Sequence, residues 1–92
     1  MVYKVTDFLT DIIYLVEQRW VGADQIWGLA DKAGLVDISQ KISFFRELKK
    51  LIRLIPPEIF ADEEQRQNMI NAAQQAQDRA IEDEEDMFDG LD

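Results

Sequence analysis

The fold is decided by the stretch DISQKISFFRELKKLIRLIPP, residues 37–57. Its apolar residues recur every three or four positions, which is the spacing of one face of an α-helix. Pro56 and Pro57 cannot continue a helix, because proline lacks a backbone N–H and its ring collides with the preceding turn. We therefore predict a helix that begins near Asp37 or Ser39 and ends just before the prolines. Its apolar face consists of Phe44, Phe45, Leu48, Leu51, Ile52 and Ile55.

The same helix carries four basic residues on nearly the opposite side. We call them the basic stripe: Arg46, Lys49, Lys50 and Arg53. Like charges on adjacent helical turns repel each other by a few tenths of a kcal/mol per pair. Two interpretations stay open, namely a solvated face or a surface that meets an acidic group. That group would belong to nucleic acid, to a partner protein or to the protein's own C-terminal third.

Charge is distributed unevenly along the chain, whose formal net charge is −9. Residues 1–61 hold 8 basic and 8 acidic side chains, whereas residues 62–92 hold 2 basic and 11 acidic ones. Of the 43 apolar residues, 33 fall in the first segment. We therefore predict a helical core domain over residues 1–61 and an acidic C-terminal helix and tail over residues 62–92.

Two shorter helices are predicted before the central one, over residues 7–20 and 24–33. Thr6 is placed to cap the first helix. Gly22 and Gly34 are placed to close the two helices, because glycine readily takes the left-handed conformation beyond a helix end. We expect the first helix to bury a broad apolar arc made of Phe8, Leu9, Ile12, Ile13, Leu15, Val16 and Trp20.

Two aromatic residues on these helices allow different interpretations. Tyr14 falls on the side opposite the apolar arc, where it is either an isolated exposed ring or a contact residue. Trp27 falls on the apolar side of the second helix. We interpret Trp27 as a packing anchor rather than as a ring that stacks on a ligand.

A fourth helix is predicted from residue 62 to about residue 86, since this segment contains strong helix formers and neither Pro nor Gly. Asp62 and Gln65 form a capping-box signature at its start. Burying alanine methyl groups gives little hydrophobic free energy. The helix is therefore either partly exposed or packed very close to another helix, including a copy of itself. Its apolar side is Met69, Ala73, Ala76, Ala80 and Met87, joined loosely by Ile70 and Ile81.

The chain ends in a dense acidic run that also contains apolar residues. Such a run either solvates the protein or docks on a basic, apolar-floored groove. We hypothesise that it contacts the basic stripe of the same fold or an equivalent basic surface on a partner. The predicted partner-binding residues are Glu82, Asp83, Glu84, Glu85, Asp86, Met87, Phe88 and Leu91.

The composition argues against most catalytic sites. The chain has no Cys and no His, so it has no thiolate, no imidazole base and none of the preferred zinc ligands. A glycine-rich phosphate loop is also absent. We predict no catalytic, cofactor-binding or metal-binding residues. No secretory signal and no membrane span are evident, which predicts a cytoplasmic protein.

These observations predict a small all-α domain of four helices, with three in an N-terminal core. Its expected function is that of an acidic, non-enzymatic protein-interaction module: an inhibitor, adaptor or assembly factor of a microbe or its virus, with a partner that presents a basic surface. One alternative is a helix-turn-helix-like DNA-binding regulator that uses the basic stripe, although the net charge disfavours nucleic acid. Another is a structural subunit that self-assembles through the fourth helix.

Overall fold

The computed structural model describes residues 5–89, and in that range it contains four α-helices, one short 3-10 helix and no strand. The predicted small all-α domain is confirmed. The elements in chain order are α1 (Val5–Glu17), α2 (Ala23–Lys32), α3 (Ile38–Leu54), η1 (Pro57–Ile59) and α4 (Glu63–Asp89).

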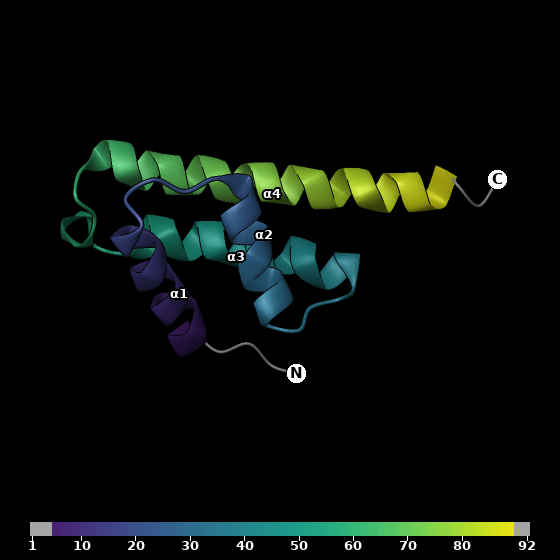
Figure 1. Ribbon diagram of the computed structural model, residues 1–92, viewed down its shortest axis with the longest axis horizontal. Helices are drawn as coiled ribbons and strands as arrows, with labels where there is room; N and C mark the ends of the chain where they lie inside the picture. The colour runs from purple at the N-terminus through teal and green to yellow at the C-terminus, as the bar shows by residue number, and fades with distance from the viewer. Residues whose placement is uncertain (1–4, 90–92) are drawn as a thin grey trace.

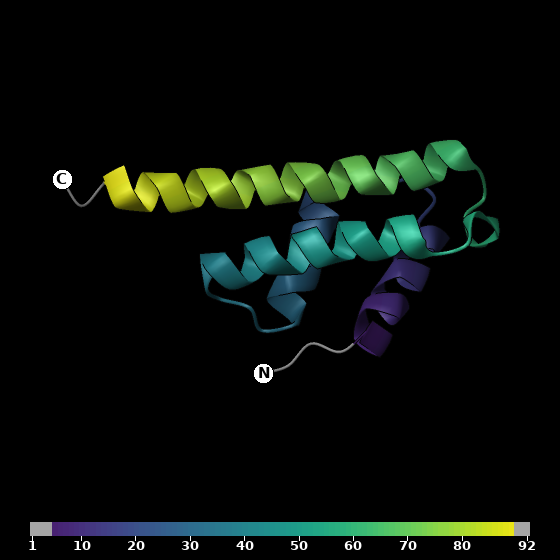
Figure 2. The ribbon, with the colours of Figure 1, turned by 180° about the vertical axis from the view of Figure 1, so that it is seen from behind.

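The two longest helices, α3 and α4, lie side by side and run in opposite directions (Figures 1 and 2). The shorter α2 crosses this pair and lies behind it in Figure 2. The C-terminal end of α4 extends past the start of α3 (Figure 1). An antiparallel pair of this kind follows from the proline-terminated α3 and the short η1 connection, which reverses the chain direction.

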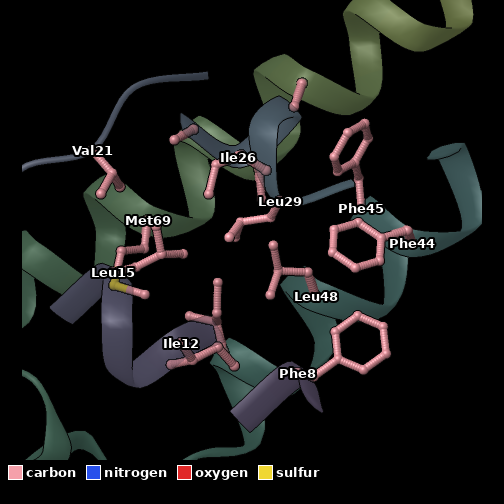
Figure 3. Close-up of a cluster of buried hydrophobic side chains, with 14 of the residues drawn as sticks. Phe8, Ile12, Leu15, Val21, Ile26, Leu29, Phe44, Phe45, Leu48 and Met69 are labelled. Atoms are coloured by element: carbon pink, nitrogen blue, oxygen red, sulfur yellow. The ribbon is translucent and has the colours of Figure 1, made fainter. Parts of the chain in front are cut away.

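One hydrophobic core joins all four α-helices. Figure 3 shows Ile12 and Leu15 of α1, Ile26 of α2, Leu48 of α3 and Met69 of α4 pointing into it. The predicted division at residue 62 therefore separates two segments of the chain that share one core, and α4 is part of that core. The buried apolar residues of α4 are Met69, Ile70, Ala72, Ala73, Ala76 and Ala80.

The alanines of α4 are covered by this chain's own helices. Ala73, Ala76 and Ala80 have no exposed surface. Small side chains allow two helix backbones to approach closely, which is one of the two outcomes predicted for this stripe. The alternative prediction, that these alanines pair with a second copy of the helix, is wrong, because their methyl groups already face the core.

The expected ends of α1 are corrected by the structure. α1 includes Thr6, whose carbonyl accepts a hydrogen bond from the Thr10 hydroxyl (2.9 Å), so Thr6 is not a cap. The left-handed residue after α1 is Arg19, with φ 67°, rather than Gly22. Gly22 instead precedes α2 as its N-cap, with φ −110°. Gly34 does follow α2 in the predicted left-handed conformation, with φ 80°.

The expected burial of α1 is wrong for part of its apolar arc. Phe8, Ile12 and Leu15 are buried, but Leu9, Ile13 and Trp20 are exposed. α1 lies at the edge of the bundle (Figure 1), so the core covers only one side of an arc that is broad enough for two neighbours.

The predicted starts of α3 and α4 agree with the structure. The Asp37 carboxylate accepts a hydrogen bond from the Ser39 N–H (2.8 Å), as an N-cap does. The Asp62 carboxylate likewise accepts from the Gln65 N–H (2.8 Å). The reciprocal bond of the capping box is shifted by one residue, because the Gln65 side-chain oxygen accepts from the Ala61 N–H (2.7 Å).

Candidate partner-binding surface

An apolar surface is left uncovered on α1 and on the turn that follows it. We call Leu9, Ile13 and Trp20 the α1 patch; Ile13 is 55% exposed and Trp20 is 65% exposed. Leu9 and Ile13 are one helical turn apart and therefore adjacent on the helix surface. Half-buried Val16 lies on the same side of α1, and Trp20 stands in the turn after the helix ends at Glu17. Exposed large apolar side chains gathered in one segment of a small protein are typical of an interaction site.

The turn that carries Trp20 is held in an unfavourable backbone conformation. Arg19 has φ 67°, which costs a residue with a side chain about 1–2 kcal/mol. The buried Gln65 side chain in the first turn of α4 stabilises this turn. Its amide donates hydrogen bonds to the carbonyls of Val16 (2.9 Å) and Arg19 (3.5 Å).

A second amide side chain fixes the other side of Trp20. Asn68 accepts a hydrogen bond from the Val21 N–H (3.0 Å) and donates one to the Val21 carbonyl (3.0 Å). Val21 is itself buried in the core. Trp20 is therefore exposed on a rigid turn, between residues that α4 holds by their backbones.

A surface hollow of about 300 Å³ lies beside Trp20. Its lining contains two carboxylates, one guanidinium group and apolar groups, so the acidic excess suits a partner side chain with an apolar body and a basic tip. The lining residues are Arg19, Trp20, Ala61, Asp62, Glu64 and Gln65.

The acidic end of α4, residues 82–89, begins beside the start of α3 and extends past it (Figure 1). The Ser39 hydroxyl donates a hydrogen bond to the Glu84 carboxylate (3.5 Å). The N-terminal end of a helix carries a partial positive charge, which favours a carboxylate there. Glu82 and Glu85 are exposed, and Asp83 and Glu84 are half-buried. The side chains of Asp86, Met87 and Phe88 and all of Leu91 lie outside the described part of the structure.

The basic stripe lies in the C-terminal half of α3, away from this acidic end. The Lys49 ammonium donates a hydrogen bond to the Gln74 side chain. Because α3 and α4 are antiparallel, the Glu84 position is ten residues beyond Gln74, or about 15 Å along α4. The prediction that the acidic run contacts the basic stripe of the same fold is therefore wrong for the described residues.

The basic stripe surrounds a hollow of about 340 Å³, together with Leu54, which is 70% exposed. Burial, helped by the nearby guanidinium groups of Arg53 and Arg46, lowers the pKa of Lys49, and the Asp78 carboxylate opposes this. The stripe is therefore a locally positive surface on a protein with a strongly negative net charge.

Residues 6–86 match the TyeA family model. The chain belongs to the TyeA family. Proteins of this family are helical, non-enzymatic regulators of type III secretion that bind a partner protein. The predicted protein-interaction module agrees with the family. The match includes the α1 patch, the basic stripe and Glu82–Asp86, whereas Met87, Phe88 and Leu91 lie beyond it.

The geometry of this TyeA-family chain disfavours the helix-turn-helix alternative. A recognition helix contacts bases through its N-terminal residues. Here the start of α3 lies beside Glu84, and that carboxylate would repel phosphate groups. Between residues 5 and 89, no group of three acidic, His or Cys residues is arranged to hold a metal ion. Over the same residues, no helix has the length and apolar character of a membrane span.

The sequence reasoning missed the α1 patch because it assigned Leu9, Ile13 and Trp20 to the core. A signal was nevertheless present in the width of the apolar arc. An arc of about 160° is wider than one neighbouring helix covers, so part of it required a second partner. That partner is not supplied by the described residues of this chain.

Proposed function

We propose that this TyeA-family chain regulates type III secretion by binding a partner protein through the α1 patch, on the cytosolic side of the secretion apparatus. The observation that carries this proposal is the exposure of Trp20 on a turn that Gln65 and Asn68 hold rigid. Exposed tryptophans on rigid surfaces contribute much of the free energy of protein–protein binding, because they lose little conformational freedom.

The chemistry of the patch favours an amphipathic helix as the binding element of the partner. Leu9 and Ile13 form a short apolar stripe, and Trp20 borders a hollow with Asp62 and Glu64 on its rim. A helix with apolar residues at positions i and i+4 and a basic residue nearby complements this arrangement.

The acidic end of α4 is a second candidate contact, with a basic surface of the partner. It extends past α3 (Figure 1) and holds exposed Glu82 and Glu85. Exposed ion pairs contribute only about 0–1 kcal/mol each, so these carboxylates mainly speed the encounter. Exchanging Glu82 and Glu85 for Gln should slow association and leave dissociation almost unchanged in stopped-flow measurements.

Calorimetric titration tests the main proposal, with the partner that TyeA-family proteins bind taken from the same genome. Trp20→Ala should weaken binding by about 2 kcal/mol or more, as expected for a central aromatic residue. Tyr14→Ala is the matched control, because Tyr14 is 52% exposed but lies on another side of α1. Unchanged affinity for Trp20→Ala would contradict the proposal.

A further inference from the structure

We propose that two copies of this chain form a reciprocal antiparallel dimer, in which the acidic end of α4 of each copy lies on the basic stripe of the other. The contact uses neither α1 nor Trp20, so it is independent of the partner-binding proposal above.

Among the described residues, no carboxylate forms a close ion pair with the basic stripe, although the Asp78 carboxylate influences the Lys49 ammonium. Among the described residues, the ion pairs of the protein use Lys41, Arg66 and Arg79, and none uses a residue of the stripe. Lys49 donates only to the neutral Gln74 side chain. Four cations on two turns repel each other, so an acidic surface placed against them relieves an unfavourable arrangement.

The chain itself supplies an acidic stripe of matching spacing. The basic residues fall at positions 46, 49, 50 and 53, and acidic residues fall at positions 82, 85, 86 and 89. Both sets are spaced by three, one and three residues, and α4 is helical through Asp89. Two helices with matching charge spacing and opposite sign can pair, and the described side chains of α4 that take part are those of Glu82 and Glu85.

Members of both sets also belong to the same side of the α3–α4 pair. Gln74 is bonded to Lys49, and the Asp78 carboxylate acts on the same ammonium. Glu82 and Glu85 continue the line of these two residues along α4, at intervals of four and three residues. This spacing keeps them on one side of a helix. Glu82 and Glu85 therefore share the side of α4 on which Lys49 of the basic stripe meets this helix.

The distance between the acidic end and the basic stripe allows two copies to pair about a two-fold axis. Glu85 is eleven residues beyond Gln74, or about 16 Å along α4. If a second copy lies antiparallel on this side, its stripe meets the acidic end of the first copy and its acidic end meets the first stripe. A two-fold contact of this kind satisfies both pairs of surfaces and closes the assembly at two copies.

Exposed apolar side chains accompany both surfaces. Leu54 lines the hollow within the basic stripe, and Ile81, which is 36% exposed, adjoins Glu82. Charge pairs on the surface give little net free energy, so apolar contact is needed for a stable pair. Leu54 and Ile81 supply it at the two places where the charges meet.

Sedimentation velocity on two charge-reversed variants tests the dimer. The first variant carries Lys49→Glu and Lys50→Glu, and the second carries Glu82→Lys and Glu85→Lys. We expect the wild type to dimerise and each variant alone to dimerise at least about tenfold more weakly, because like charges then face each other. An equimolar mixture of the two variants should form a heterodimer, since each basic surface again faces an acidic one.

A matched control separates this contact from an effect of overall charge. Glu17→Lys with Glu64→Lys changes the net charge by as much as the second variant does, at exposed positions outside both surfaces. This control should dimerise at least as well as the wild type. Circular dichroism of each variant establishes that it is folded.

Three results would overturn the proposal. They are a wild type that stays monomeric at every concentration, variants that dimerise as well as the wild type, and a mixture that stays monomeric although both variants are folded. Growth of the mixture beyond two copies would also contradict it, because an open head-to-tail contact does not close.

Discussion

The two tryptophans of this chain are seven residues apart and occupy opposite environments. Trp27 packs against the Phe45 ring, with centroids 5.7 Å apart, and is half-buried. The charged groups of Lys41 and Arg79 lie over its ring, at 4.6 and 4.5 Å from the centroid. Trp20 has most of its surface exposed and stands on a turn fixed by hydrogen bonds from α4.

The difference shows how a small bundle separates stability from recognition. The Trp27 region joins α2, α3 and α4 through ring packing and two cation–ring contacts. In the Trp20 region, side chains of α4 instead form hydrogen bonds with the backbone of the turn, and the indole stays outside the core. Polar side chains of α4 thereby hold an apolar surface in place without covering it.

The largest expected effect is on stability in the Trp27 region. Trp27→Ala and Leu48→Ala should each lower the free energy of unfolding by about 3 kcal/mol, because both remove large side chains from packed surroundings. Trp20→Ala should change it by no more than about 0.5 kcal/mol. Chemical denaturation of the three variants checks this, and a Trp20→Ala variant as unstable as Trp27→Ala would remove the contrast.

An intermediate effect is expected at Asn68, which holds the turn. Asn68→Ala leaves the N–H and carbonyl of buried Val21 without their side-chain partner and should cost about 1–3 kcal/mol. Gln67→Ala is the control, because Gln67 is exposed and bonds only to Asn71. Amide hydrogen exchange of residues 18–22 should accelerate in the first variant and stay unchanged in the second. Equal exchange in both would mean that Asn68 does not fix the turn.

The smallest expected effect is a pH dependence at Asp11 of α1. Burial raises the pKa of this carboxyl above its ordinary value of 3.8, and the Lys32 ammonium partly opposes the rise. The folded state therefore binds the proton more tightly than the unfolded state does. The resulting stabilisation is fully present below pH 3.8 and is lost as the pH rises through the folded-state pKa.

Asp11→Asn removes this titration. Its free energy of unfolding should therefore fall less than that of the wild type as the pH rises through this window, measured by urea denaturation at a series of pH values. Parallel pH profiles for the two proteins would show that burial does not raise the pKa of Asp11.

Much of the fold could be predicted from the sequence, because its strongest signals are local. Pro56 and Pro57 end α3, Asp37 and Asp62 cap helices, and the 3.6-residue spacing identifies the buried face of α3. The alanines of α4 also indicated a close helix neighbour. Each of these features depends on residues near one another in the chain.

The candidate site was harder to predict, because it depends on residues far apart in the chain. Exposure of Trp20 depends on Gln65 and Asn68, which lie more than forty positions later. The left-handed Arg19 has no sequence signal, since glycine was available at position 22. Separation of the acidic end from the basic stripe follows from the antiparallel register of α3 and α4, which spacing within one helix does not determine.

Acrylamide quenching of single-tryptophan variants tests most directly the claim that Trp20 belongs to the binding surface whereas Trp27 packs against the core. Trp27→Phe leaves Trp20 as the only tryptophan, and Trp20→Phe leaves Trp27. We predict that saturating partner protein without tryptophan lowers the quenching of Trp20 several-fold, whereas the quenching of half-buried Trp27 does not change. Unaltered quenching of Trp20 in the complex would contradict the account.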